Sequence, residues 1–325
     1  MWLAAIAILV GLAILVWSAD IFVDGATVLA KRLNVPSFLI GVLILGVGTS
    51  APEMVVSVLA ALEGSPDLAL GNAYGSNIIN IALILGVTVL ISPIIIHKSI
   101  VKRDLPLLLF ITALSAWQLR DGVLSQSDGI VLLVVLVAVL GLQIFMSLRE
   151  GNHEHEDDKV IADSSAHLQH SLTRGLASLF IGLLMLVASS RAIVWGAIES
   201  ATFFGISELV IGLTVVAVGT SLPELVSSLS AARKGEHDMA LGNIIGSNVF
   251  NTLAVVGLAA IIAPITANPI VLTRDILVMS LITLLLFAMC LFAFVSKHKF
   301  GRASGATMIL FFVGYTVWLI QTANM

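Results

Sequence analysis

The sequence predicts an all-α, polytopic membrane protein of ten transmembrane helices, arranged as two inverted five-helix repeats with the N-terminus and C-terminus outside. Three observations carry this prediction. Hydrophobic residues make up 58% of the 325 residues and charged residues only 11%, with a mean hydropathy of +1.08, which is typical of a chain surrounded by lipid. Ten apolar segments follow one another along the chain, and the sequence repeats itself at an offset of 171 residues.

Each apolar segment suits a helix, because a barrel strand would alternate polar and apolar residues over about 10 positions. The first segment has no basic region and no small-residue cleavage site, so we interpret it as a retained helix and not as a signal peptide. The fourth and tenth segments are short. The predicted helices are, in order, Ala4–Phe22, Phe38–Leu62, Leu68–Ile91, Leu105–Leu119, Ile130–Leu148, Leu176–Ile198, Leu209–Ala232, Met239–Ile262, Ile276–Val295 and Ala306–Ile320.

The repeat divides the chain into a first five-helix half (1–148), a cytoplasmic linker (149–174) and a second, inverted half (175–325). Matches at the 171-residue offset extend through both halves, from Gly11 and Gly182 to Pro93 and Pro264. Thirteen of the 16 Lys and Arg residues lie in the loops after the odd-numbered helices. The excess of positive charge predicts that these loops are cytoplasmic. An odd number of helices in each half then turns the second half upside down, as in many secondary transporters.

The linker is rich in His, Glu and Asp, from His153 to Lys159. We interpret it as a solvated connection; a regulatory cation site is the weaker alternative, because a flexible acidic stretch fixes no ligand geometry. The net charge of −4 without a basic cluster argues against nucleic acid as a partner. Cys290 is the single cysteine, which excludes disulfides and thiolate metal clusters. We expect the lipid bilayer as the main partner and no obligate protein partner.

The repeat is strongest between residues 40–80 and 211–251, where 22 of 41 aligned pairs are identical. Its first core is GTSxPE, which places Glu53 and Glu224 at equivalent positions inside apolar segments. A carboxylate at the centre of a membrane helix costs about 2.5–3.5 kcal/mol on insertion scales, so such residues mark ion or proton pathways. No Lys or Arg lies centrally in a predicted helix to neutralise them. The two glutamates are therefore the primary candidates for a functional site.

Each glutamate follows a proline that interrupts the helix. We expect Pro52 to free backbone carbonyls around Gly46 to Thr49, and Pro223 to free those around Ala217 to Thr220. Irregular backbone at membrane depth is tolerated where it lines a cavity or binds ions. Each break thus predicts carbonyl, hydroxyl and carboxylate oxygens within one or two turns. Taken alone, Thr49 or Ser50 has a more ordinary interpretation, a hydrogen bond to its own helix backbone.

The second core of the repeat is GNxxGSNxxN. Its polar residues fall on one helical face: Asn72, Ser76 and Asn80 in the first half, and Asn243, Ser247 and Asn251 in the second. Paired glycines four positions apart form a small-residue edge that permits close helix packing, and packing alone is an equally good explanation for them. The complete donor set consists of oxygens, which suits Ca²⁺ and Na⁺. Zinc or copper would call for Cys or His, and all seven histidines lie in loops or at helix ends.

These two cores resemble the alpha-repeats of the cation/calcium exchanger superfamily, in its sodium/calcium exchanger branch with small prokaryotic members. The stretches GTSAPE and GNAYGSNIIN, with GTSLPE and GNIIGSNVFN, carry the resemblance. It implies a multi-pass protein of the bacterial cytoplasmic (inner) membrane that carries Ca²⁺ and Na⁺ and needs no organic cofactor. Asn stands at both positions 80 and 251 where potassium-dependent members carry an Asp in the second repeat, which argues against a K⁺ requirement.

The resemblance also implies a role for each residue of the motifs. Glu53 and Glu224 would be the central ligands shared by both cations, and the remaining oxygens would complete the cation sites. These remaining candidates are Thr49, Thr220, Ser50, Ser221, Ser76, Ser247, Asn80, Asn251 and the carbonyls of Gly46 and Ala217.

We therefore predict a secondary antiporter that exchanges Na⁺ for Ca²⁺ by alternating access. A cation/H⁺ antiporter using the same glutamates is the close alternative, because a carboxylate also carries protons. A channel is less favoured, since channels more naturally use rings of symmetric subunits. An intramembrane enzyme is disfavoured too, because Ser50 and Ser221 have no predicted His or Lys base at membrane depth.

Overall fold

The computed structural model describes residues 2–64, 66–150, 172–204, 217–267 and 269–323. Helices dominate these residues, and two-residue strands β1 (Val123–Leu124) and β2 (Ile265–Thr266) form one short antiparallel pairing. Most of the predicted linker, including the stretch from His153 to Lys159, lies outside the described residues. The described chain is an α-helical, polytopic membrane protein in its composition and helix lengths.

The first half contains the long helices α1 (Trp2–Leu33) and α8 (Gln126–Glu150) and several spans built from joined segments. Wider π-helical turns, labelled η1, η2 and η3, occur within these spans. The segments between α1 and α8 are α2 (Ser37–Ile40), η1 (Gly41–Gly46), α3 (Val47–Thr49), α4 (Ala51–Leu62), α5 (Pro66–Ile78), η2 (Ile79–Leu85), α6 (Gly86–Ile91), η3 (Ile100–Asp104), α7 (Leu105–Gln118) and the 3-10 turn η4 (Leu119–Asp121).

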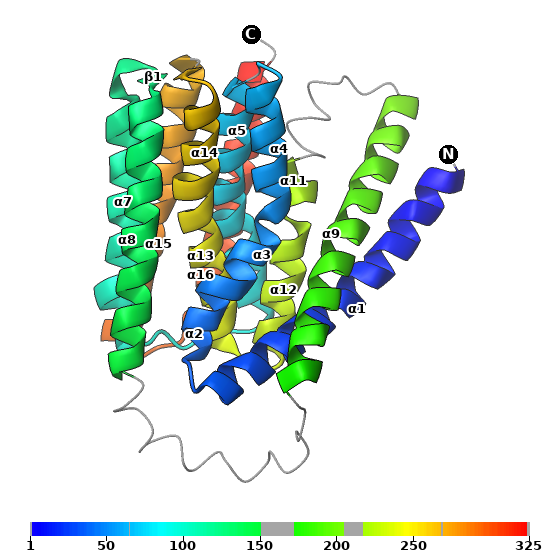
Figure 1. The fold of residues 1–325 in the computed structure, drawn as a ribbon, viewed down its shortest axis with the longest axis vertical. Helices are drawn as coiled ribbons and strands as arrows, with labels where there is room; N and C mark the ends of the chain where they lie inside the picture. Colours follow the sequence, from blue (N-terminus) through cyan, green and yellow to red (C-terminus); the bar gives the residue numbers. More distant parts are fainter. Residues whose placement is uncertain (1, 65, 151–171, 205–216, 268, 324–325) are drawn as a thin grey trace.

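The second half follows the same order. After α9 (Leu172–Phe203), the described helices are α11 (Ala217–Thr220), α12 (Leu222–Arg233), α13 (His237–Phe250), η9 (Asn251–Val255), α14 (Val256–Ile262), η10 (Val271–Ile276), α15 (Leu277–Val295) and α16 (Arg302–Ala323). The helices α3 and α4 run in the opposite direction to α11 and α12 (Figure 1).

Seven of the described helices are long and apolar enough to cross a membrane, or eight if the bent pair Ser37–Thr49 and Ala51–Leu62 counts as one span. Two predicted spans are not among them. The helix predicted at Leu105–Leu119 is α7, which has 14 residues and is preceded by the charged turn η3. The helix predicted at Leu209–Ala232 lies partly outside the described residues. The ten-helix plan therefore stays a proposal.

Predicted ends were wrong for the first and sixth helices, which are both longer than expected. The helix α1 continues past Phe22 to Leu33, and α9 continues past Ile198 to Phe203. Asp20 and Asp24 consequently lie well within α1, where they contact Ser230 and Lys234. Arg191, expected near the end of the sixth helix, lies within α9. Charged side chains are tolerated inside these helices because partners or exposed positions are available to them.

The helices α1 and α9 pack along each other as one unit, which leans away from the remaining helices at one end (Figure 1). Glycines allow the two backbones to approach closely, because they have no side chain. An added Cβ at Gly25 would lie 2.5 Å from the backbone nitrogen of Leu179, and one at Gly182 would lie 2.6 Å from that of Phe22. At 32 residues each, these helices exceed the roughly 20 residues that span a bilayer, so tilt is expected.

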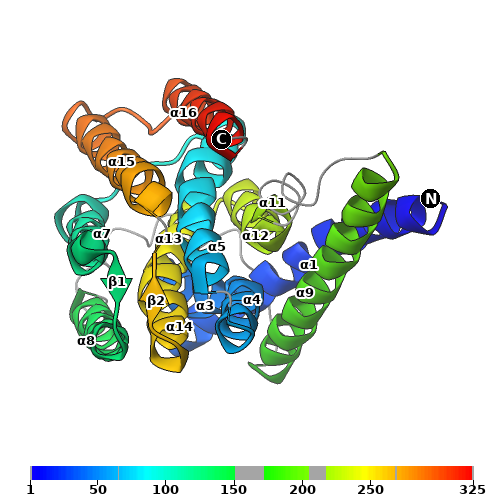
Figure 2. The ribbon, with the colours of Figure 1, turned by 90° about the horizontal axis from the view of Figure 1, so that it is seen from above.

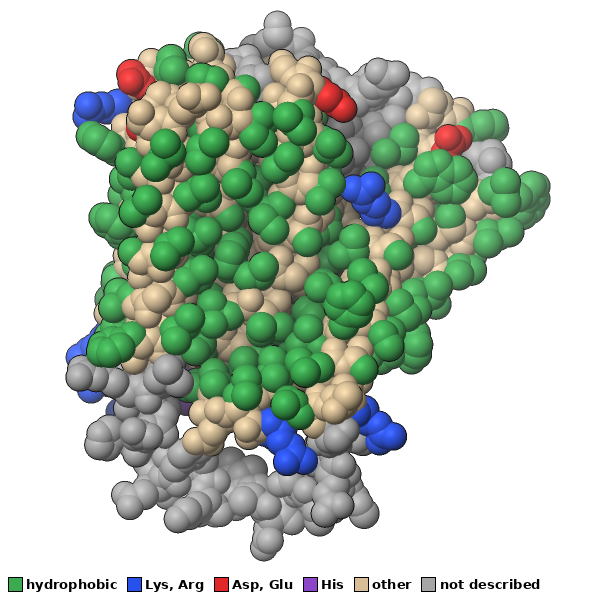
Figure 3. Space-filling model, in the orientation of Figure 1, with side chains coloured by type: hydrophobic (Ala, Val, Ile, Leu, Met, Phe, Trp, Pro, Cys, Tyr) green, Lys and Arg blue, Asp and Glu red, His purple; other side chains and the backbone are tan. Residues whose placement is uncertain are grey.

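The other helices form a bundle around α5 and α13, as seen from above in Figure 2. The spans Leu68–Ile91 and His237–Ile262 are 72% and 89% buried, whereas the outer spans beginning at Gln126 and Arg302 are each 22% buried. On the face shown in Figure 3, hydrophobic side chains form a broad band, and most of the charged side chains lie near the two ends. This arrangement explains the apolar character of the whole sequence, since the outer helices face lipid.

The start of α1 and the end of α16 lie at one end of the molecule, and the end of α8 and the start of α9 lie at the other (Figure 1). We call these the terminal end and the linker end. Their relative placement agrees with the predicted topology, in which the linker and the termini occupy opposite sides.

Candidate functional site

The two helix breaks of the repeat place both glutamates in the first turn of a new helix. The first break occurs at Ser50 (φ −81°, ψ 4°), and the chain bends by 45° between α3 and α4. The second occurs at Ser221 (φ −89°, ψ 7°), before α12. Pro52 and Pro223 then fall in the first helical turn, where the missing N–H leaves no hydrogen bond unmade. The helix therefore restarts directly, with a glutamate at its N-terminal end.

The expectation that Pro52 frees the carbonyl of Gly46 was wrong. This oxygen accepts a hydrogen bond from the backbone N–H of Ser50 at 3.2 Å and one from the hydroxyl of Ser247 at 3.4 Å. The helical hydrogen bond persists because the break lies after Gly46, at Ser50. A cation that used this carbonyl would displace the Ser247 hydroxyl. Ala217, its counterpart in the repeat, is the first residue of α11.

The two repeats exchange hydrogen bonds across the site. The Ser50 hydroxyl donates to one carboxylate oxygen of Glu224 at 3.3 Å, and the Ser221 hydroxyl donates to one carboxylate oxygen of Glu53 at 3.4 Å. Each serine belongs to the motif of the opposite repeat. The two motifs, 171 residues apart in the sequence, therefore form a single site in which each carboxylate is held by the other half.

Both carboxylates are fully buried, at 0% exposure. The second carboxylate oxygen of each, Oε2, has no hydrogen-bond partner, and among the described residues neither glutamate forms an ion pair. Two buried negative charges without a compensating positive charge are costly at membrane depth. The site is therefore suited to a cation, which would supply the missing charge.

The helix α13 supplies further oxygens to the first break. The Thr49 hydroxyl lies 2.9 Å from the backbone oxygen of Leu45 and 3.2 Å from the side-chain oxygen of Asn243, either of which can accept its single proton, and it lies 3.4 Å from the Ser247 hydroxyl. The backbone bond matches the ordinary interpretation that the sequence allowed for Thr49. Its contacts to α13 show that the same hydroxyl also faces the opposite repeat.

Asn80 and Asn251 lie at the π-helical turns η2 and η9, fully buried. In the part of the chain that the structure describes, neither the amide nitrogen nor the oxygen of either side chain has a hydrogen-bond partner. The turn η2 packs against α12, which carries Glu224, and η9 packs against α4, which carries Glu53. Ser76 is also buried with an unpartnered hydroxyl. These unsatisfied polar groups are further candidates to contact an ion, water or another ligand.

Two serines that support the glutamates, Ser57 and Ser228, were not predicted from the sequence. Asn72 donates to the backbone oxygen of Glu53 at 3.1 Å and to the hydroxyl of Ser57 at 2.9 Å. In the second repeat, Asn243 donates to the backbone oxygen of Glu224 at 3.3 Å and to the hydroxyl of Ser228 at 2.9 Å. Ser57 and Ser228 are identical at the 171-residue offset, so the repeat itself contained the signal.

The small-residue edge of α13 brings the two repeats into backbone contact. An added Cβ at Gly246 would lie 2.7 Å from the Cα of Val42, and one at Gly242 would lie 2.4 Å from the backbone oxygen of Phe38. Phe38 and Val42 both belong to Ser37–Thr49, the first segment of the bent pair. Close packing therefore also forms the candidate site, because the approach of α13 brings Asn243 and Ser247 next to Thr49.

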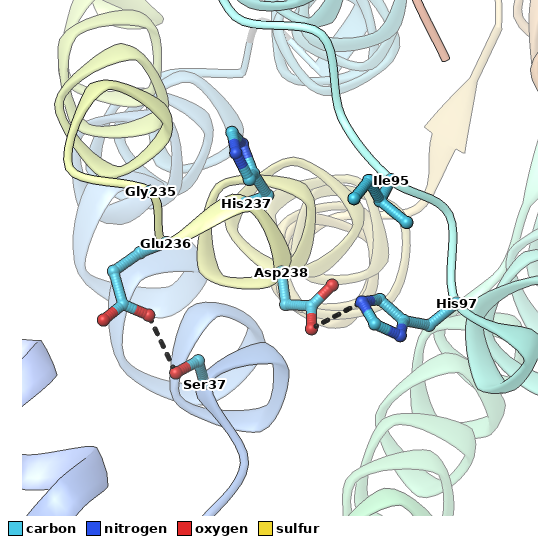
Figure 4. Close-up of a pocket in the computed structure, with 7 residues that line it drawn as sticks. All are labelled: Ser37, Ile95, His97, Gly235, Glu236, His237 and Asp238. Carbon is cyan, nitrogen blue, oxygen red and sulfur yellow. Dashed lines mark hydrogen bonds and ion pairs between the residues drawn. The ribbon is translucent and has the colours of Figure 1, made fainter. Parts of the chain in front are cut away.

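A separate hollow at the N-terminal end of α13 is lined by acidic and His side chains (Figure 4). His97 and Asp238 point toward each other, with 3.6 Å between Nε2 and Oδ2, and Ser37 donates to Glu236 at 2.9 Å. His237 points away from both. Within the described residues, no three His, Cys, Asp or Glu side chains are placed to hold a metal ion.

Comparison with known proteins agrees with the motifs. Residues 3–145 and 174–321 match the family described as sodium/calcium exchanger protein. The inner membrane protein YrbG of Escherichia coli (strain K12) is 39% identical over 98% of this chain and 96% of its own. The sodium/calcium exchanger MaX1 of Methanosarcina acetivorans is 33% identical over 96% of this chain and 97% of its own.

A solved structure gives the same result for the fold. The sodium–calcium exchanger NCX_Mj superposes with a TM-score of 0.82 and 32% sequence identity over 98% of both chains. The fold, the paired glutamate motifs and the family match over nearly the whole length agree with one another. This chain therefore belongs to the sodium/calcium exchanger family of membrane antiporters.

Proposed function

We propose that this protein is a secondary active antiporter that exchanges Na⁺ for Ca²⁺ across the cytoplasmic membrane by alternating access. Glu53 and Glu224 are its central cation ligands. The observation that carries this proposal is the reciprocal pairing of Ser50 with Glu224 and Ser221 with Glu53. It joins two buried carboxylates in one site without a basic partner among the described residues.

Charge explains how one site can serve both ions. One Ca²⁺ neutralises two carboxylates, and Na⁺ ions do so with the help of neutral oxygens. The oxygens that would coordinate the cations are the second carboxylate oxygens of Glu53 and Glu224 and the unpartnered side-chain oxygens of Ser76, Asn80 and Asn251. Because each ion neutralises the same pair, occupancy by one excludes the other. Competition of this kind couples the two fluxes without simultaneous binding.

The remaining candidates fit around this centre. Thr49 and Ser247, with the Gly46 carbonyl, form the side of the site next to α13. Thr220 and Ala217 take the equivalent positions of the second repeat. Ten transmembrane helices in two inverted repeats, with both termini outside the cell, are part of the same proposal. The relative named an inner membrane protein supports placement in a bacterial inner membrane.

The test is ⁴⁵Ca²⁺ uptake into proteoliposomes loaded with Na⁺, compared with vesicles loaded with K⁺ or choline. We expect uptake only with internal Na⁺, with no need for K⁺ and no response to an imposed pH gradient. Uptake driven by a proton gradient alone would replace this proposal with cation/H⁺ exchange at the same glutamates. Absence of Ca²⁺ flux under both gradients would remove Ca²⁺ as the substrate.

A further inference from the structure

The turns after α4 and α12 carry residues of opposite charge at equivalent positions. Glu63 follows α4 (φ −83°, ψ 3°) and Lys234 follows α12 (φ −81°, ψ 0°). A glycine in the left-handed region comes next in each turn, Gly64 at φ 74° and Gly235 at φ 82°. Because the two helices run in opposite directions, these matching turns lie toward opposite ends of the molecule (Figure 1).

At the linker end, Lys234 ties α12 to α1. Its ammonium group lies 2.6 Å from a carboxylate oxygen of Asp24 and donates to the backbone oxygen of Asp20 at 2.8 Å. The hydroxyl of Ser230, also on α12, donates to the Asp20 carboxylate. The helices α1 and α12 pack against each other around these contacts. We call this set the linker-end contact.

The 171-residue offset that matches Lys234 to Glu63 also matches Asp20 to Arg191 on α9. The Lys234 ammonium also lies 3.9 Å from the Asp20 carboxylate. The repeat provides these two positions a second time, as Glu63 in the first half and Arg191 in the second, with the charges exchanged, whereas Asp24 matches the uncharged Trp195. Both Glu63 and Arg191 are exposed, and among the described residues neither side chain forms an ion pair or hydrogen bond. The α1–α9 unit packs on α12 near the linker end, whereas α9 makes no comparable contact with α4 in the described part of the chain.

We propose that Glu63 and Arg191 form the terminal-end counterpart of the linker-end contact, and that the transport cycle alternates between the two. This inference rests on the alternating-access mechanism proposed above. The linker-end contact holds the conformation seen here. In the opposite conformation, the α1–α9 unit leaves α12, the Lys234 contacts break, and Arg191 reaches Glu63 to close the terminal end.

The α1–α9 unit can move as one body because its glycines hold the two backbones together. The energetics also suit an alternating contact. Lys234 is 30% exposed and Asp24 is 65% exposed, and an exposed ion pair shifts an equilibrium by only about fivefold or less. Each contact can therefore bias one conformation without preventing the other. Each contact pairs one acidic with one basic side chain, so neither end of the molecule is left with an additional net charge when its contact forms.

Cross-linking tests the approach of the two residues directly. In a Cys290→Ala background, Glu63→Cys with Arg191→Cys is treated with a short bifunctional thiol reagent. We expect a cross-link that stops exchange, and release by a cleavable reagent that restores it. The control pair is Glu63→Cys with Leu184→Cys, two turns closer to the linker end on the same helix. Equal cross-linking of the control, or none in the test pair, would overturn the proposal.

Charge reversal tests the interaction. Arg191→Glu and Glu63→Arg should each slow Na⁺-driven ⁴⁵Ca²⁺ uptake about two- to fivefold, and the double variant should recover most of the loss. Glu199→Lys is the matched control, because its counterpart in the first repeat is the apolar Val28; it should leave uptake unchanged. A double variant slower than either single variant contradicts the contact.

The two proposals fail in different ways. A cross-link without Na⁺-driven uptake in the unmodified protein would support the contact and reject Na⁺/Ca²⁺ exchange. Normal uptake with no cross-link and no effect of charge reversal would reject the contact and leave the exchange proposal intact.

Discussion

At the scale of single residues, the candidate site contains two carboxylates that have no counter-charge among the described residues. Glu53 and Glu224 are each held by one serine hydroxyl from the opposite repeat, and each keeps one oxygen without a partner. A buried charge in this position is stable only when something neutralises it. Under the proposed function, the transported cation supplies this neutralisation.

Glu53→Gln and Glu224→Gln should each weaken Ca²⁺ binding by about 30-fold or more, because removal of one partner from a buried charged contact costs roughly 2–5 kcal/mol. Isothermal titration of Ca²⁺ into the detergent-purified protein measures this affinity. Glu53→Asp keeps the charge and serves as the matched control. Unchanged affinity in either Gln variant would show that the central ligands have been assigned wrongly.

Asn72→Ala should destabilise the protein by about 1–3 kcal/mol, because it leaves the Glu53 carbonyl and the Ser57 hydroxyl without their buried donor. Asn243→Ala should have the same effect through Glu224 and Ser228. Thermal unfolding in detergent measures the change. Thr307→Ala in α16 is the control, since its hydroxyl only bonds to the backbone of its own helix at an exposed position. A loss no larger than that of the control would argue against the supporting role.

At the scale of elements, backbone contact between α13 and the segment Ser37–Thr49 brings the residues of the site together. Gly242 and Gly246 allow α13 to approach α2 and η1. The same approach places Asn243 and Ser247 beside Thr49. Side chains at these glycines would separate the helices before they could meet.

Gly246→Ala should lower stability by about 1–3 kcal/mol and reduce exchange, because the new methyl group would lie 2.7 Å from the Val42 Cα and the backbone would have to move. Gly314→Ala in α16 is the matched control, since its Cβ meets no described atom within 4 Å. Unfolding temperature and ⁴⁵Ca²⁺ uptake should fall in the first variant and not in the second. Equal behaviour of the two would mean that the close approach is unimportant.

At the scale of the whole molecule, the terminal end and the linker end are opposite faces (Figure 1). The proposed orientation puts the terminal end outside the cell. In a Cys290→Ala background, a membrane-impermeant thiol reagent should label Glu199→Cys, near the end of α9, in intact cells and should not label Lys31→Cys, near the end of α1. Both positions are exposed. Permeabilised cells should show labelling at both. The reverse pattern in intact cells would invert the topology.

Much of the architecture could be predicted because lipid imposes a simple rule on sequence. A spanning helix must be apolar and must satisfy its own backbone, so hydropathy locates helices well. The same rule does not locate helix ends when charged residues find partners. The first helix was predicted to end at Phe22, near Asp20 and Asp24, yet α1 continues to Leu33, with Ser230 and Lys234 as partners of these two carboxylates.

The residues of the candidate site could be predicted from the sequence, but their hydrogen-bond partners could not. Glu53 and Glu224 could be identified because buried carboxylates without a basic neighbour are rare in membrane helices. The expected loss of hydrogen bonding at Gly46 was wrong, since a proline in the first turn of a new helix leaves the preceding helical bond intact. Ser57 and Ser228 were missed because a single serine in an apolar helix usually bonds to its own backbone.

The sequence by itself determined that this is a helical membrane protein with a duplicated, oxygen-rich motif centred on two glutamates. Hydropathy and internal repetition are properties of the chain alone, and both survive in any packing of the helices. Only the tertiary structure decided that Ser50 serves Glu224 and Ser221 serves Glu53, and that Lys234 contacts α1 while Glu63 and Arg191 stand apart. Those relations depend on how two inverted halves are placed against each other, which no local pattern specifies.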